Sequence, residues 1–279
     1  MLTVNFDLTK FESVELIELA DIHIGNPLCM ESKLKEIVDY ILEEPSDPKM
    51  ARVCLLNGDL TESVTKSSVG NVFEQTMSPS VQVATILKYL RPLTETSEKY
   101  PMGKIICYCA GNHDESRYKD TGISAAENIA VGLGLEDRFS VNGCYNFLKL
   151  KRRGSNDDFC YISVYNTHLS GGGSTIGGKA NRLLKAGLNG GIVADIICAA
   201  HVHQAMTFKE DLILPASYGK IAQKTMTYVI CSSFLAYGDY AQRSGMKPST
   251  FSIPKIFIRQ GKNYDKDGQR RYIYTEVLL

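Results

Sequence analysis

The sequence has no excess charge of either sign, because Lys plus Arg and Asp plus Glu both number 31 among its 279 residues. Net charge therefore gives no drive toward nucleic acid or a membrane surface, although a local basic patch can still exist. No run approaches the roughly 18 apolar residues of a membrane span. Residues 1–10 include Asp7 and lack the basic-then-apolar pattern of a signal peptide. We therefore expect a cytoplasmic protein with no membrane partner.

No two cysteines have the Cys-x-x-Cys spacing, although the chain contains eight cysteines. Most of them lie in apolar runs with the composition of strands. With 44% hydrophobic residues, a chain of this length can bury a sizeable core without a disulfide framework. We therefore expect reduced, mostly buried thiols that take no part in a metal site.

The spacing of apolar residues predicts strand–helix alternation first and a strand-rich second half. Strands are expected at Ser13–Ala20, Arg52–Leu56, Lys104–Ala110, Phe139–Leu150, Phe159–Thr167, Ile192–Ala199, Thr207–Leu214, Thr225–Ser232, Phe251–Ile258 and Arg271–Leu278. Helices are expected at Glu31–Glu44, Val81–Tyr100 (bent near Pro92), Ser124–Leu133 and Lys179–Leu188, with a loop at Thr61–Ser80. No linker, repeat or composition break appears, so we expect one α/β domain over residues 1–279.

The chain has only five histidines, and each follows an expected strand. They are His23, His113, His168, His201 and His203. The carboxyl ends of strands are where open α/β folds build their sites. A single histidine at such a place is more often a structural residue than a functional one. Five scattered structural histidines would not be expected to share this placement, so we interpret them as parts of one site.

Side chains with oxygen ligands accompany these histidines. The seven candidate ligands are Asp21, His23, Asp59, Asn112, His168, His201 and His203. Asp21-x-His23 and His201-x-His203 would each place two side chains on one side of an extended strand end. Seven ligands are too many for one tetrahedral ion and suit two ions, with Asp59 as the bridge because its carboxylate has two oxygens. The set favours manganese, with iron, zinc or nickel as alternatives, over a structural zinc held by thiolates.

The order and spacing of these residues resemble the calcineurin-like metallophosphoesterase superfamily. The matching blocks are Asp21-x-His23, Gly58-Asp59, Gly111-Asn112-His113-Asp114, His168 and His201-x-His203. Each block alone is a weak signal, and the five together are specific. The resemblance implies a β-sandwich of two mixed sheets flanked by helices, and hydrolysis of phosphoesters with two metal ions. Within the superfamily, the chain is similar to compact, phage-type members of the double-strand-break repair exonuclease branch.

The same resemblance implies a role for each residue of the blocks. The first metal ion would be held by Asp21, His23, Asp59 and His203. The second would be held by Asp59, Asn112, His168 and His201. His113 would bind no metal and would face the leaving group, oriented by Asp114. Members of this fold that act only as scaffolds usually lose ligands, whereas this chain keeps all seven.

Two groups of basic residues are candidates for substrate binding. The glycine-rich segment 171–178 precedes Lys179, but Ala180 stands where an ATP-binding P-loop has a hydroxyl residue, so we reject an ATP site there. Backbone N–H groups of the segment and Lys179 could instead hold a substrate phosphate. The second group is Lys149, Lys151, Arg152 and Arg153. It is either a solvated hairpin tip or a contact to a nucleic-acid backbone.

The sequence thus predicts a two-metal phosphoester hydrolase, with a phosphodiester in nucleic acid as the foremost substrate. A nucleotide or cyclic-nucleotide phosphodiesterase and a phosphoprotein phosphatase are the alternatives among enzymes. A metal-bound interaction module without turnover is the rival from another class. The metals would polarise phosphoryl oxygens and lower the pKa of bound water from about 15.7 toward about 7. His113 would protonate the departing oxygen or stabilise its charge.

Overall fold

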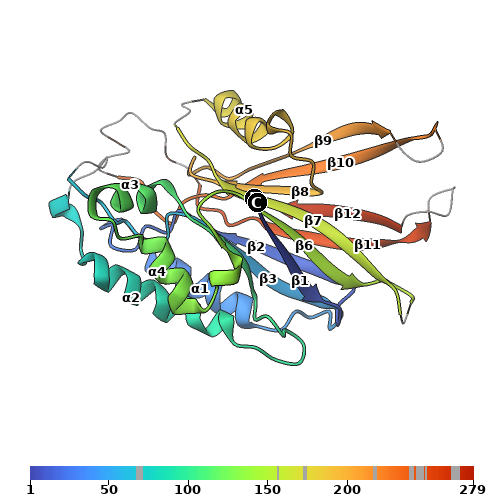
Figure 1. The fold of residues 1–279 in the computed structure, drawn as a ribbon, viewed down its shortest axis with the longest axis horizontal. Coiled ribbons are helices and arrows are strands. Elements are labelled where there is room, and N and C mark those ends of the chain that lie inside the picture. Colours follow the sequence, from blue (N-terminus) through green and yellow to red (C-terminus); the bar gives the residue numbers. More distant parts are fainter. Residues whose placement is uncertain are drawn as a thin grey trace.

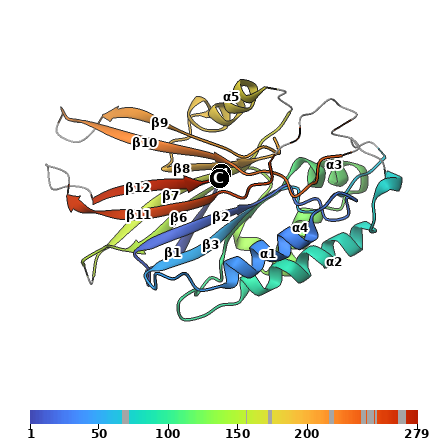
Figure 2. The same ribbon diagram turned by 180° about the vertical axis from the view of Figure 1, so that it is seen from behind.

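The computed structural model describes residues 1–66, 72–155, 157–171, 175–215, 219–238, 242, 248, 250–264 and 271–279. Its strands form two six-stranded sheets, and helices cover the sandwich from outside (Figure 1). The view from behind shows α1 and α2 side by side along one face (Figure 2). The predicted α/β architecture of two mixed sheets flanked by helices is confirmed.

The first sheet, sheet A, has the order β1-β6-β7-β8-β10-β9. Its strands are β1 (Leu2–Leu8), β6 (Cys144–Lys151), β7 (Phe159–His168), β8 (Ile196–Ala200), β9 (Met206–Pro215) and β10 (Ile221–Ile230). Strands β7, β8 and β10 run parallel to one another, whereas β6 and β9 join the sheet as antiparallel partners of β7 and β10. The parallel centre of the sheet sends its carboxyl ends to a common edge.

The second sheet, sheet B, has the order β12-β11-β2-β3-β4-β5. Its strands are β2 (Ser13–Leu19), β3 (Met50–Asn57), β4 (Ile105–Cys109), β5 (Phe139–Ser140), β11 (Lys255–Tyr264) and β12 (Arg271–Leu278). The four strands β2 to β5 are parallel, whereas β11 pairs antiparallel with both β2 and β12. A large apolar core that includes Leu16, Leu55, Leu148 and Val164 lies between the two sheets.

The helices are α1 (Glu31–Leu42), α2 (Pro79–Leu90), α3 (Asn112–Thr121), α4 (Ala125–Leu133) and α5 (Ile176–Ala186). Leu34 of α1, Ile86 of α2 and Ile129 of α4 share a core cluster with Ile17 and Leu56 of sheet B. Leu183 of α5 packs with Ile197 and Tyr228 of sheet A. The result is a helix–sheet–sheet–helix arrangement in which both sheets have a covered outer face.

Several predicted elements differ from the observed ones. The second helix ends at Leu90, and Arg91–Thr94 form a 3₁₀ turn, because Pro92 has no N–H to continue the helix. The predicted strand Phe139–Leu150 is two strands, β5 in sheet B and β6 in sheet A, so the chain changes sheets between them. Strand β1 and helix α3 were not predicted. Parts of the expected loops, residues 67–71, 156 and 172–174, lie outside the described residues.

None of the eight cysteines, all of which lie among the described residues, forms a disulfide bond. Six of them are buried, as expected for thiols in apolar strands, and burial raises the pKa of Cys54 to about 12. No helix among the described residues is long and apolar enough to cross a membrane.

Candidate metal centre

Five strands from the two sheets lead to one group of polar side chains. In sheet B, strands β2, β3 and β4 are followed by Asp21, Asp59 and Asn112. In sheet A, β7 ends at His168 and β8 is followed by His201. The His201 N–H donates to Asp21 Oδ2 at 2.8 Å, which ties the ends of the two sheets together. The structure therefore brings together candidate ligands that lie far apart in the chain.

Five of the candidate ligands have a left-handed backbone, which residues other than glycine rarely adopt. They are Asp21 (φ 50°), His23 (φ 54°), Asp59 (φ 49°), His201 (φ 84°) and His203 (φ 55°). The expectation that the two ligand pairs follow extended strand ends is therefore wrong. Such conformations cost on the order of 1–3 kcal/mol each and cluster at functional sites, where the surrounding fold sustains them.

The first cluster consists of Asp21, His23 and His203, whose ligand atoms all lie within 4.8 Å of one another. Nε2 of His203 is 3.4 Å from Oδ1 of Asp21, and the His23 and His203 ring centroids are 5.3 Å apart. Asp21 and His23 are buried, whereas the His203 side chain is 38% exposed. The cluster therefore has a buried floor and one side open to solvent.

The second cluster consists of Asp59, His168 and His201, again within 4.8 Å. Nε2 of His168 lies 3.2 Å from Asp59 Oδ2 and 3.0 Å from Asn112 Oδ1. On the other side of the ring, Nδ1 lies 2.8 Å from the Asn57 carbonyl oxygen. Because a carbonyl only accepts, Nδ1 donates to it. In the protonated ring Nε2 also donates, to the two oxygens, whereas loss of that proton would leave an Nε2 lone pair for a metal ion.

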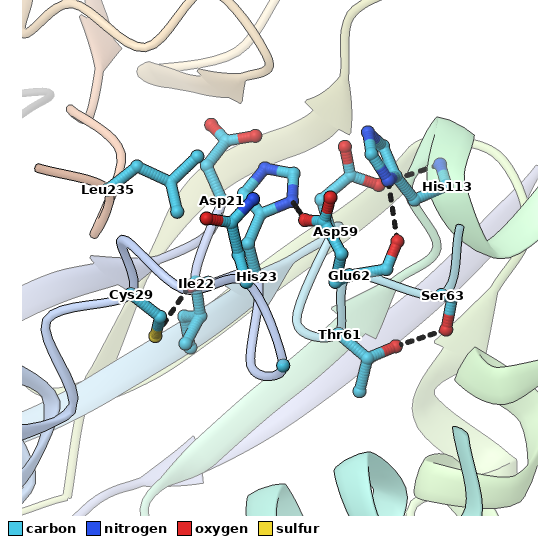
Figure 3. A network of polar contacts seen from close by, with 12 residues as sticks. Asp21, Ile22, His23, Cys29, Asp59, Thr61, Glu62, Ser63, His113 and Leu235 are labelled. Carbon is cyan, nitrogen blue, oxygen red and sulfur yellow. Dashed lines mark hydrogen bonds and ion pairs between the residues drawn. The ribbon is translucent and has the colours of Figure 1, made fainter. Parts of the chain in front are cut away.

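Glu62 joins two histidines in a third group, which sequence reasoning missed. Its Oε2 accepts from His23 Nδ1 at 3.0 Å, and its backbone carbonyl accepts from His113 Nδ1 at 2.7 Å (Figure 3). The His23 and His113 rings meet edge to face with centroids 4.7 Å apart. Glu62 could have been recognised as a candidate from the sequence, because it is an acidic residue three positions after Asp59.

Burial and the charges of the two clusters shift the pKa of several groups. Burial would raise the pKa of Asp21, but His203 and His168 outweigh it and lower this pKa to about 2. Burial would lower the pKa of His168, but Asp59 outweighs it and raises this pKa to about 10. The pKa of His201 is lowered by burial and by the charge of His168. In a site of this kind, a metal ion binds by displacing protons from the imidazoles.

Unpartnered atoms in the first cluster fit a bound divalent ion. Among the described residues, the buried His23 Nε2 has no hydrogen-bond partner, and the buried Asp21 Oδ1 has only the 3.4 Å ion-pair contact with His203. Buried polar atoms in folded proteins nearly always have a partner. Since Glu62 accepts from His23 Nδ1, the lone pair of a neutral His23 ring is on Nε2 and faces the cluster. The donor set of imidazoles and carboxylates therefore suits the metal ions expected from the sequence.

Asp114 has a different partner from the one expected. Its Oδ2 accepts from the Gly111 N–H at 3.0 Å, which fixes the turn that starts α3. His113 instead points Nδ1 at the Glu62 carbonyl, so Asp114 does not orient the His113 ring by a direct hydrogen bond. Burial and the charge of Asp59 raise the pKa of Asp114 to about 7.

Lys179 contacts the segment that follows strand β8 and carries His201 and His203. Its Nζ donates to Oε1 of Gln204 at 2.8 Å, and Gln204 directly follows His203. Arg182, one turn further along α5, donates to the carbonyl of Ser170, which lies two residues after His168. Helix α5 therefore places two basic side chains beside the strand ends that carry the histidines.

The basic run at residues 149–153 lies at the other end of sheet A. Lys151 pairs with Phe159, the first residue of β7, whereas His168 is the last residue of that strand. At about 3.3 Å per residue, the two ends of β7 are roughly 30 Å apart. The β6–β7 turn and helix α3 accordingly lie at opposite ends of the molecule (Figure 1). The structure does not bring this run to the candidate metal-ligand clusters.

Gly111 allows the second cluster to form, because a Cβ there would overlap the Asp59 carboxylate and lie 2.6 Å from Asp59 Cγ. We expect Gly111→Ala to displace that carboxylate and weaken metal binding by at least about tenfold. Gly177→Ala in α5 is the matched control, since its Cβ would meet nothing within 4 Å. Calorimetric titration with Mn²⁺ measures both; equal affinities for the two variants would contradict this account of the cluster.

A scan against protein families and a search of curated proteins found no match. Among solved structures, the chain is similar to a crystal structure of Vps29 from Chaetomium thermophilum. The two share 12% sequence identity over 95% of this chain and 97% of that chain, with a TM-score of 0.34. At this level of similarity, we transfer no property of that protein to this chain.

Fold and site together define an α/β sandwich of two mixed six-stranded sheets with neighbouring His/Asp clusters that could hold metal ions. The clusters lie where strands from both sheets meet.

Proposed function

We propose that this chain is a two-metal phosphoester hydrolase that cleaves phosphodiesters in nucleic acid. The observation that carries the proposal is the pair of neighbouring clusters, each with one carboxylate and two imidazoles. The His113 ring, 4.7 Å from that of His23, supports it, because it supplies a titratable group beside the metal ligands. A structural zinc site would have one closed shell and no such neighbour.

The ligands are assigned to two ions in the proposal. Asp21, His23 and His203 would hold one ion, Asn112, His168 and His201 would hold the other, and Asp59 would be shared between them. When bound, the ions polarise the phosphoryl oxygens and lower the pKa of a bound water toward about 7. The protein holds the ligand rings in place before substrate binds. Glu62 accepts a hydrogen bond from the His23 ring, and the Asn57 carbonyl accepts one from the His168 ring.

His113 acts on the leaving group in this proposal. Its Nδ1 hydrogen is directed to the Glu62 carbonyl, so Nε2 is the nitrogen that can exchange a proton with substrate. Burial would lower the pKa of His113, but Asp59 and Glu62 outweigh it and raise this pKa. A protonated His113 would donate to the departing oxygen as the ester bond breaks.

Basic residues lie at two different distances from the clusters, which favours a nucleic-acid polymer over a small nucleotide as the substrate. Lys179 would hold a phosphate next to the one cleaved. The basic run at residues 149–153 lies roughly 30 Å from the clusters along β7. DNA advances about 3.4 Å per base pair, so about nine base pairs would span this distance. A polymer can engage both regions at once, whereas a mononucleotide cannot.

Hydrolysis of a chromogenic phosphodiester, a chromogenic phosphomonoester and DNA oligonucleotides in Mn²⁺ tests the proposal. We expect hydrolysis of the diester and the DNA, little hydrolysis of the monoester, and loss of all activity on chelation. Turnover of the monoester alone would support a phosphatase instead. A metal-loaded protein that hydrolyses no ester would support the interaction module.

Replacing the basic run with alanine separates a polymer from a small substrate. The variant combines Lys149→Ala, Lys151→Ala, Arg152→Ala and Arg153→Ala. We expect weaker binding of duplexes longer than about nine base pairs, and a log–log salt slope that flattens by up to about one unit for each side chain that no longer reaches a phosphate. Hydrolysis of the chromogenic diester should not change and serves as the internal control. Unchanged binding of long duplexes would favour a small nucleotide substrate or another binding face.

A further inference from the structure

Polar side chains end three inward-facing rows of the core between the sheets. Side chains alternate along a strand, so every second residue faces inward. In β2, the inward-facing Val14 and Leu16 are followed by Glu18. In β3, Val53 and Leu55 are followed by Asn57. In β7, Ile162 and Val164 are followed by Asn166. Glu18, Asn57 and Asn166 are all 0% exposed. A polar layer therefore separates the apolar core from the metal-ligand clusters.

The burial of Glu18 in this layer lowers the stability of the fold. Its Oε1 accepts from Asn57 Nδ2 at 2.6 Å, but its Oε2 has no hydrogen-bond partner among the described residues. Burial raises the pKa of Glu18 well above its usual range, and its contacts with the Asn57 side chain and the Cys231 backbone offset this only in part. Burying a carboxyl group with an unpaired oxygen costs stability, and an apolar residue of the same shape would avoid that cost. Such a residue calls for a role beyond holding the fold.

Asn57 connects Glu18 to the second cluster. Its side-chain Nδ2 also donates to the Thr167 carbonyl of the opposite sheet at 3.0 Å. Its own backbone carbonyl accepts from His168 Nδ1 at 2.8 Å. The Asn57 residue thus carries a short path of hydrogen bonds from a buried carboxyl group to a ring that faces Asp59.

Glu15, in the same strand, is a buried carboxylate with a purely structural role and serves as a comparison for Glu18. It is 1% exposed on the outer face of sheet B. Its Oε2 accepts from Arg52 Nε at 2.7 Å and its Oε1 from the Tyr40 hydroxyl at 2.6 Å, so both oxygens are paired. Glu15 has an opposite charge beside it, whereas the strongest partner of Glu18 is a neutral amide on the path to the cluster.

We propose that Glu18 is a positioning residue of the metal centre, which holds Asn57 and through it fixes the ring of His168. The inference rests on the proposed two-metal site. Residues that orient a ligand histidine typically contribute 10–100-fold to metal affinity. In this proposal, the ordering of the site by Glu18 compensates for the stability lost by burying a carboxyl group with an incomplete set of hydrogen bonds.

Glu18→Met and Glu18→Gln test the proposal, with Mn²⁺ affinity measured by calorimetric titration and stability by thermal unfolding of the chelated protein. Methionine keeps the length of the side chain and removes the acceptor. We expect it to weaken one of the two Mn²⁺ affinities by about 10–100-fold while the metal-free protein unfolds at the same or a higher temperature. Glutamine keeps an oxygen that accepts from Asn57, so it should retain affinity within about threefold.

Glu15→Gln is the matched control, because it alters a buried carboxylate in the same strand away from the clusters. It should lower the unfolding temperature by weakening the contact with Arg52 and leave both Mn²⁺ affinities unchanged. A Glu18→Met protein that is less stable or unfolded, or that binds both ions normally, would overturn the proposal. Absence of Mn²⁺ binding by the unaltered protein would instead contradict the metal centre itself.

Discussion

Replacing Asp59 with asparagine should abolish hydrolysis and reduce the metal content at both sites. Asp59 is 1% exposed, and its Oδ2 lies 3.2 Å from Nε2 of His168. Its Oδ1 accepts from the His113 N–H at 2.9 Å, so one carboxylate joins the second cluster to the start of α3. An asparagine would supply a single neutral oxygen, and two divalent ions would lose the negative charge between them.

Metal analysis and the rate of hydrolysis of a chromogenic diester measure the effect of Asp59→Asn. Asp39→Asn is the control, because Asp39 is an exposed carboxylate of α1 that pairs with Lys35. We expect a rate at least about a thousandfold lower for Asp59→Asn, which corresponds to about 4 kcal/mol of transition-state stabilisation. Two metals per chain together with a near-normal rate would show that Asp59 is no bridge.

Replacing His113 with glutamine should separate catalysis from metal binding. The other four histidines all lie in the first or second cluster, whereas His113 lies only in the third group, with His23 and Glu62. If His113 protonates the leaving group, glutamine cannot replace it, and the rate should fall by about two to four orders of magnitude. The metal content should stay the same, because no ligand of either ion has changed.

Lys119→Gln on the exposed face of α3 is the control for His113→Gln, since it alters the same helix away from the site. Metal content by mass spectrometry and the rate with the chromogenic diester are measured on both variants. Loss of one metal equivalent from His113→Gln would assign this residue as a ligand of the group with His23 and Glu62. A full rate with full metal content would remove it from the reaction.

The sheets were largely predictable because their strands carry strong local signals. Strand β3 is buried at every position, and its apolar run stands out in the sequence. Helix α3 was missed because Asn112–Thr121 contains no apolar stripe; it is fixed at its start by the Asp114 carboxylate. Strand β1 was missed although Val4, Phe6 and Leu8 alternate with exposed residues, so there the signal was present.

The candidate ligands were predictable because each follows a strand, and strand ends meet at one edge of a sheet. The left-handed backbone of these residues was not predictable, because a positive φ at Asp21 or His201 depends on contacts between the two sheets. The role of Glu62 was also hidden, because its partners lie 39 and 51 residues away in the chain. The contact of Glu18 with Asn57 joins two neighbouring strands and leaves no local pattern in the sequence.

The number of divalent ions bound per chain is the most direct test of the metal centre. Protein stripped with a chelator, reloaded separately with Mn²⁺, Fe²⁺, Zn²⁺ or Ni²⁺ and freed of excess ion would be analysed by inductively coupled plasma mass spectrometry. The clusters of Asp21 with His23 and of Asp59 with His168 predict two ions per chain with at least one of these metals. A folded protein that retains none of the four metals would contradict the account.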